Sequence, residues 1–200
     1  MLLVANPSLP AKNIAELIAL AKKKPDELSY ASFGNGSASH LAGELFTNQA
    51  GIKMNHIPYK GGAPAITDTL SGQVPMSFSA FGVALPHVKS GKLIALGTTG
   101  PARAKLLPDV PTIEEAGNLK AYEMSIVYAV WAPAGVPAPI VGKLTKALEQ
   151  VVASTAFKEK VASDGGEVMN LSTPTESNVY FQKEMQRLSK IVKDGNIKAD

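Results

Sequence analysis

The sequence predicts an α/β fold built around a mainly parallel sheet. Short apolar segments alternate with helical patterns through the first half of the 200-residue chain, and this alternation is typical of βα units. A second observation is that glycine-rich turns join several of the expected strands to the helices that follow. Beyond about residue 122 the pattern becomes mostly helical, so we expect that region to belong to a different part of the architecture.

The expected strands are short apolar runs, and the expected helices carry apolar residues at a spacing of three or four. Leu17, Ile18 and Ala21 show this spacing in the first helix, which Pro25 ends, while Gly51 ends the second helix. In chain order, the expected elements are a strand at 2–5, a helix at 14–24, a strand at 28–32, a helix at 37–50, a strand at 54–58, a helix at 63–70, a strand at 74–80, a helix at 84–89, a strand at 93–98 and a helix at 112–116.

The later part begins with a β-prone run at 122–132, which is too long for one short buried strand. We therefore expect this run to cross between two bodies of the protein. After a proline-rich break at 133–139, the expected elements are helices at 140–152 and 156–163, a short strand at 168–171 and a helix at 175–192.

The start of the last helix has its own signature. Thr173 is expected to be the cap, with Pro174 at the first position and Glu176 at the third. The helices of this region have an apolar face but little sheet of their own, so they need a partner surface.

Composition narrows the function classes. The chain is 45% hydrophobic, and no apolar run approaches the roughly 20 residues that a membrane span requires. The net charge of +3 comes from lysines spread along the chain, and aromatic residues make up only 6%. This is unlike the basic stripe with interleaved aromatics of a nucleic-acid-binding protein, so no nucleic-acid partner is expected. Cysteine is absent, which excludes disulfides and thiolate chemistry.

Two turns have the chemistry of an anion site. Residues 34–39 run from a strand through Gly34-Asn35-Gly36-Ser37 into a helix that opens with small polar residues. Residues 59–63 likewise lead from a strand through two glycines into a helix. Backbone N–H groups at a helix start favour a carboxylate, glycines let the backbone approach it, and hydroxyls add donors. The alternative for the first turn is an ordinary βα turn with a serine cap, and for the second it is turn chemistry alone.

Catalytic, metal and cofactor sites are not expected. No Gly-x-Ser-x-Gly elbow occurs, and Gly34-x-Gly36 lacks the third glycine of a dinucleotide fingerprint. His40, His56 and His87 show no metal-ligand spacing, and we interpret His40 as a residue that packs its helix or braces the loop. The sequence therefore predicts a binding protein, not an enzyme.

Five motifs in order carry a family resemblance. They are Gly34 to Leu41, Pro58 to Ala65, Ala84 to Lys92, Leu107 to Gly117 and Ala132 to Pro137. In this order they resemble the Bug family, the TctC-like extracytoplasmic solute receptors of tripartite tricarboxylate transporters. The resemblance covers Leu3 to Lys198.

The resemblance implies a fold like that of type II periplasmic binding proteins, in which two α/β lobes close on a small ligand. Residues 1–122 would form one complete α/β lobe, and 123–200 would hold the crossing strand and the C-terminal part of the other. The N-terminal part of that other lobe would be absent, about a third of an ordinary member. A periplasmic location is implied as well, although Met1 to Pro7 does not read as a secretory signal.

The resemblance also implies a small organic carboxylate as ligand and membrane transporter subunits as partners. Ser79 and Ala80 stand where the family often has an Asp-Asn pair, which favours a simple carboxylate over an amino acid. The implied binding residues are Asn35, Gly36, Ser37, Ser39, Tyr59, Gly61, Gly62, Ala63 and Ser79.

The alternative is a non-binding truncated homologue with an interaction role. Apolar positions in 140–151 and 180–191 could then be covered by a second copy of the chain, giving a homo-oligomer through the incomplete lobe.

Overall fold

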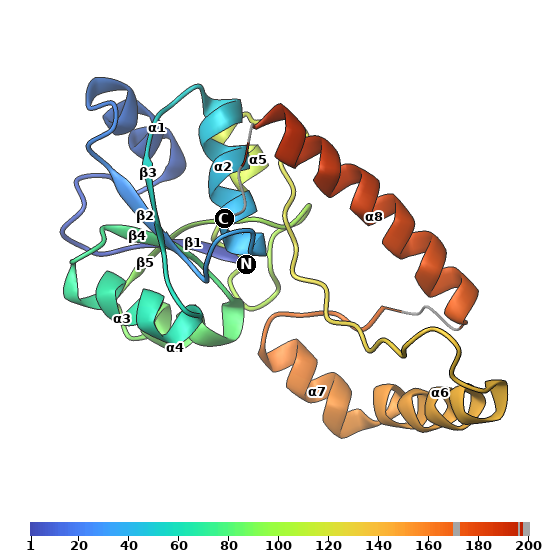
Figure 1. The fold of residues 1–200 in the computed structure, drawn as a ribbon. Coiled ribbons are helices and arrows are strands. Elements are labelled where there is room, and N and C mark those ends of the chain that lie inside the picture. The colour runs from blue at the N-terminus through green and yellow to red at the C-terminus, as the bar shows by residue number, and fades with distance from the viewer. Residues whose placement is uncertain (170–172, 196, 198–200) are drawn as a thin grey trace. The chain divides into compact units, whose positions relative to one another are not determined.

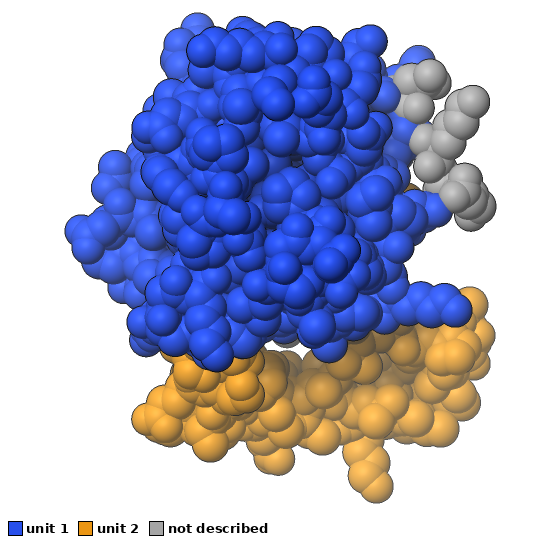
Figure 2. All heavy atoms as spheres, turned by 90° about the vertical axis from the view of Figure 1, so that its left-hand side faces the viewer, with its two compact units in different colours: residues 1–126, 187–200 blue, residues 127–186 orange. Residues whose placement is uncertain are grey.

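The structure is a computed structural model that describes residues 1–169, 173–195 and 197. It divides the chain into two compact units, which Figure 2 shows in different colours. Unit 1 holds residues 1–126 and the described residues from Arg187 on, and unit 2 holds residues 127–186. The lobe boundary between 122 and 123 stays a prediction.

Unit 1 contains a five-stranded sheet with the strand order β3-β2-β4-β1-β5. The strands β2, β3 and β4 are parallel, whereas β1 is antiparallel to both β4 and β5. The prediction of a mainly parallel sheet therefore misses the direction of β1. The strands are β1 (Leu2–Ala5), β2 (Ser29–Ser32), β3 (Asn55–Pro58), β4 (Met76–Ser79) and β5 (Ile94–Thr98).

Helices cover both faces of this sheet (Figure 1). The helices of unit 1 are α1 (Ile14–Lys23), α2 (Ala38–Ala50), α3 (Gly62–Ser71), α4 (Phe81–Lys89) and α5 (Ile113–Gly117), joined by the end of α8 (Pro174–Asp194). Neighbouring residues of β1 point to opposite faces, so Leu3 packs with Ile14, Phe46 and Phe78, while Leu2 packs with residues of α3 and α4. All four residues of β1 are fully buried, which suits their continuous apolar sequence.

The helix that precedes Lys89 starts earlier than the sequence predicts. It begins at Phe81, not at Ala84, because Phe81, Ala84 and Leu85 together cover the face of the sheet that carries Leu2. Burial of these side chains outweighs the cost of Pro86, which lies beyond the first turn, where proline is poorly tolerated.

The predicted crossing run at 122–132 is not a strand in the structure. Its beginning belongs to unit 1, where Tyr122 and Met124 are buried and Met124 exchanges hydrogen bonds with Thr99. These bonds do not extend into a ladder, so no strand forms. The run does pass from unit 1 to unit 2, after residue 126.

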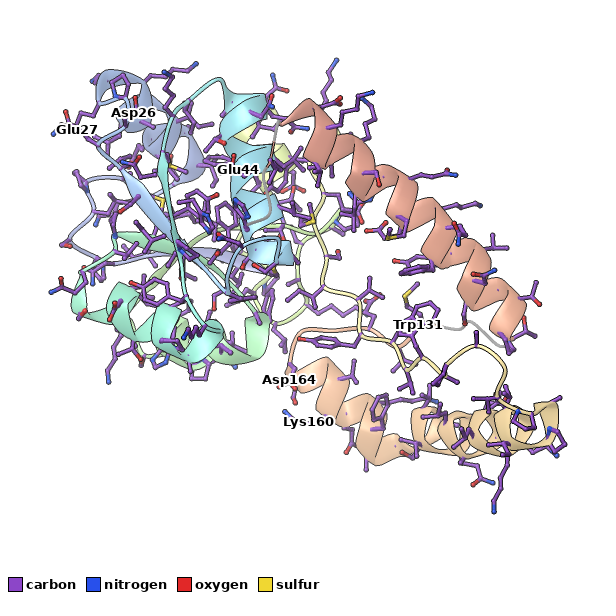
Figure 3. All side chains as sticks on the ribbon, in the orientation of Figure 1. Asp26, Glu27, Glu44, Trp131, Lys160 and Asp164 are labelled. Carbon is purple, nitrogen blue, oxygen red and sulfur yellow. The ribbon has the colours of Figure 1, made fainter. Side chains whose placement is uncertain are left out.

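In the described residues of unit 2, the regular secondary structure is all helical. This unit holds α6 (Ala138–Ala153), α7 (Thr155–Ser163) and the first part of α8, and Trp131 packs against Phe181 with ring centroids 4.6 Å apart. Figure 3 labels Trp131 on the segment before α6. The predicted start of α8 is confirmed, since the Thr173 hydroxyl accepts from the Glu176 N–H and the Glu176 carboxylate accepts from the Thr173 N–H.

The predicted strand at 168–171 does not form at residues 168 and 169, and its other two residues lie outside the described ones. Within the described ranges, no helix is long and apolar enough to cross a membrane.

Candidate functional site

Three helices of unit 1 begin at one edge of the sheet. The parallel strands β2, β3 and β4 lead into α2, α3 and α4, so the carboxyl ends of these strands and the starts of the three helices share that edge. Ligands of parallel α/β sheets collect at such an edge, where helix N–H groups point outward. The two turns that the sequence singles out are the first two of these three connections.

The structure brings these two turns together. The Tyr59 N–H donates to the Ser32 carbonyl (3.1 Å), and the Gly61 N–H donates to the Phe33 carbonyl (3.1 Å). At Gly34, φ is +131° and an added Cβ would lie 3.0 Å from the Tyr59 carbonyl oxygen. Glycine is therefore required at position 34 both by its backbone conformation and by the close approach of the second turn.

The start of α4 joins the same cluster. A Cβ added at Gly62, the first residue of α3, would lie 3.4 Å from the Phe33 ring and 3.9 Å from the Val83 side chain in the first turn of α4. Sequence reasoning missed this third helix start, because Ala80, the residue before α4, is not a polar capping residue and gives no signal.

The serine hydroxyls of the first turn act within the turn. The Ser37 hydroxyl donates to the Gly34 carbonyl (2.7 Å) and accepts from the His40 N–H, which makes it the cap of α2. The Ser39 hydroxyl is fully buried and accepts from the Phe33 N–H (2.8 Å). These contacts fit the capping alternative for the side chains of Ser37 and Ser39.

The Tyr59 hydroxyl is likewise engaged. It donates to the Asp68 carboxylate on α3 (2.7 Å). Burial, followed by this bond to the carboxylate, raises the pKa of Tyr59 to about 12. The phenol therefore stays protonated at neutral pH and ties the second turn to the helix that follows it.

Capping distinguishes α3 and α4 from the other helices of unit 1. Side chains cap α1, α2 and α5. Asn13, Ser37 and Thr112 each accept a hydrogen bond from a backbone N–H in the first helical turn of their own helix. By contrast, Gly61 and Ala80 precede α3 and α4 and provide no side-chain cap. The first N–H groups of both helices therefore meet no capping side chain, as an anion site needs.

Ser79 adds a buried hydroxyl at the end of β4, two residues before α4 begins. The residue is 1% exposed, and its Oγ has no hydrogen-bond partner in the described part of the chain. A buried polar atom without a partner is costly, and such atoms mark places where a ligand or a water completes the bonding. The hydroxyls of Ser77, on the same strand, and of Thr98, at the end of β5, share this property.

The predicted residues thus lie on three connected turns. Asn35 and Gly36 are exposed at the tip of the first turn, Gly61, Gly62 and Ala63 form the start of α3, and Ser79 precedes α4. Lys60 is exposed, and no acidic side chain belongs to this set. Over the described ranges, no group of three or more His, Cys, Asp or Glu side chains is placed to hold a metal ion.

Comparison with known proteins identifies the family. The family described as "Tripartite tricarboxylate transporter family receptor" matches residues 1–197. Protein BugT of Bordetella pertussis is 33% identical over 198 residues, which cover 99% of this chain and 60% of BugT.

Two solved structures show the same fold. The R. palustris protein Rpa4515 with adipate has a TM-score of 0.91 at 32% identity and is matched over 98% of this chain and 65% of its own. MatC from Rhodopseudomonas palustris with bound malate has a TM-score of 0.84 at 27% identity, over 96% of this chain and 65% of its own. The chain thus spans about two thirds of either solved neighbour.

These matches confirm the resemblance seen in the sequence, including the mixed α/β fold of periplasmic binding proteins. The matched proteins are solute receptors and not enzymes. The chain belongs to the tripartite tricarboxylate transporter receptor family, the family of the Bug proteins.

Proposed function

We propose that this chain binds a small organic carboxylate at the starts of α2, α3 and α4. The observation that carries the proposal is the convergence of three helix starts at one edge of the sheet, two of them without a side-chain cap. Each start offers main-chain N–H groups at the positive end of a helix dipole. Together they suit an anion whose several oxygens can each accept a hydrogen bond.

The donor set favours a simple carboxylate. The predicted binding residues carry hydroxyl, amide and main-chain groups and no carboxylate, so nothing among them would pair with the ammonium group of an amino acid. Family membership supports the same ligand class, since one structural neighbour holds adipate and another holds malate. Both are dicarboxylates, which gives the first compounds to test.

The proposed role is that of a receptor that passes its ligand to the membrane subunits of a tripartite transporter. The family description supports this partnership, and the likeness to periplasmic binding proteins supports a periplasmic location. The chain performs no chemistry in this scheme. The ligand shifts the conformational equilibrium of the protein, because it binds one conformation more tightly than another.

Calorimetry with a panel of mono- and dicarboxylates, including adipate and malate, tests the proposal. A Gly62→Pro variant sharpens it, because proline is well tolerated at the first helical position and removes the N–H with which α3 begins. We expect binding of at least one acid and a loss of about fivefold in its affinity in this variant.

The matched control is Thr155→Pro, which makes the same change at the first position of α7. It should leave the affinity unchanged. Absence of heat and of thermal stabilisation with every acid would refute carboxylate binding by this chain.

A second candidate role, self-association, has one observation in its favour. The residues Ile140, Leu144, Leu148 and Val151 line one face of α6, and each is at least 40% exposed. An apolar face of this kind is suited to a second copy of the chain. Light scattering tests it: a monomer at all concentrations would exclude this role.

A further inference from the structure

Two histidine rings are stacked beside the first turn. His40 on α2 and His56 on β3 have ring centroids 3.8 Å apart and planes inclined by only 6°. Tyr30 on β2 extends the stack, with its ring 5.2 Å from that of His56. His40 is only 6% exposed, so its ring orientation is fixed by its surroundings.

Each histidine is connected to one glycine N–H of the turn. His40 Nδ1 accepts directly from the Gly36 N–H (3.1 Å). His56 Nε2 lies 2.6 Å from the Ser32 hydroxyl, and that hydroxyl accepts from the Gly34 N–H (3.1 Å). The two rings therefore hold the two glycine peptides that shape the turn, one directly and one through Ser32.

The bond to Gly36 depends on the protonation state of His40. A ring nitrogen accepts a hydrogen bond only when it carries no proton, so this contact requires a neutral His40 with its proton on Nε2. That nitrogen faces Glu44, 3.8 Å away, and Glu44 in turn accepts from the Tyr30 hydroxyl (2.7 Å).

Glu44, Tyr30 and His56 are the titratable groups that the described contacts bring against His40. Figure 3 labels Glu44 on α2. Its carboxylate favours a charge on His40, whereas a charge on the stacked His56 opposes it. Burial and the Glu44 bond raise the pKa of Tyr30 well above its ordinary value, so Tyr30 remains a neutral donor.

We propose that the His40–His56 stack sets the shape of the carboxylate-binding turn and makes carboxylate affinity depend on pH. The proposal rests on the proposed function, because it concerns the same turn. His40 is a positioning residue: it acts on the ligand through the Gly36 peptide. When Nδ1 takes up a proton, two N–H groups face each other, the Gly36 bond is lost and the turn loses its fixed shape.

The first test needs no ligand. The probe is the hydrogen-exchange protection of the Gly36 amide in the whole chain, measured by NMR between pH 8 and pH 5.5. We expect protection in the wild type to fall over this pH range as His40 takes up a proton on Nδ1. His40→Asn keeps an acceptor near the position of Nδ1, so it should retain protection without this pH dependence. His40→Leu should lose protection at every pH.

The second test uses adipate and malate as probes over the same pH range. Wild-type affinity should fall by about fivefold from pH 8 to pH 5.5, and the affinity of His40→Asn should stay level. His87→Asn is the control, because His87 lies in the last turn of α4, and it should behave as the wild type.

The two tests separate the two proposals. If neither acid binds at any pH, the proposed function fails, and the Gly36 amide still decides whether the stack shapes the turn. Equal protection of that amide in the wild type and His40→Leu would overturn the positioning role. Binding that is level with pH in the wild type, or stronger at pH 5.5, would overturn the coupling.

Discussion

Helices α1 and α6 carry the same kind of apolar stripe but end in different surroundings. In unit 1, Ile14 and Leu17 of α1 are fully buried against the sheet. In unit 2, Ile140 and Leu144 of α6 are 50% and 51% exposed, and no residue of α6 or α7 is buried. The comparison shows that an amphipathic pattern predicts a helix and a need for a partner surface, whereas burial depends on whether the chain provides that surface.

The largest contrast is expected from truncating one apolar side chain in each unit. Phe78 is fully buried between Tyr30 and Phe46, so Phe78→Ala should lower the free energy of unfolding by about 3 to 5 kcal/mol. Leu144→Ala removes a side chain that is already half exposed and should cost less than about 1 kcal/mol. Urea denaturation of the whole chain measures both. Equal losses would mean that the α6 face is buried in solution.

Adding one methyl group at a helical glycine should give effects of opposite sign in the two units. A Cβ at Gly43 of α2 would lie 2.2 Å from the Tyr30 ring, so Gly43→Ala should destabilise the chain by about 1 to 3 kcal/mol. A Cβ at Gly142 of α6 would meet nothing within 4 Å. Gly142→Ala should therefore stabilise by about 0.5 to 1 kcal/mol through helix propensity, and thermal denaturation compares the two. If Gly142→Ala destabilised the chain, another surface would have to pack against α6 at this position.

The smallest contrast concerns polar pairs. Tyr59→Phe removes the hydroxyl that donates to Asp68 and should cost about 1 kcal/mol at neutral pH. Lys160 and Asp164 pair on the exposed surface of α7 (Figure 3), and Lys160→Gln should change stability by less than about 0.5 kcal/mol.

The Tyr59 bond also predicts a pH dependence. Since the folded pKa of Tyr59, about 12, lies above its ordinary value of 10.0, the bond stabilises the fold fully below pH 10 and is lost as pH rises through 12. The difference in stability between the wild type and Tyr59→Phe should therefore shrink over that range. A difference that stays constant would refute the role of this bond.

Much of unit 1 could be predicted from the sequence because its signals are local. Pro25 and Gly51 end helices where expected, and each expected strand lies within two residues of the observed ends. The sequence pattern does not reveal the antiparallel direction of β1, because a fully apolar strand is compatible with either direction. The run at 122–132 passes from unit 1 to unit 2 but forms no strand, because its hydrogen bonds with Thr99 do not extend into a ladder.

For the two candidate turns, the sequence predicts their place at the ends of strands better than it predicts the contacts of their side chains. Glycines at 34 and 61–62 located two of the three turns, and the structure places them side by side. The uses of the hydroxyls of Ser39 and Tyr59 depend on contacts with Phe33 and Asp68, which the sequence pattern does not reveal. The sequence pattern also does not reveal the stacking of His40 on His56, because the packing of α2 and β3 brings the two rings together.

The central claim is that the helix starts of unit 1 hold a carboxylate, and an NMR titration of the isotopically labelled chain with adipate and malate tests it most directly. We expect the signals of the helix-start amides to move and saturate with one of these acids, while those of α7 do not. Saturable binding that leaves these amides unchanged would contradict the claim. The amides to follow are those of Ala38, Ser39, Gly62, Ala63, Phe81 and Gly82.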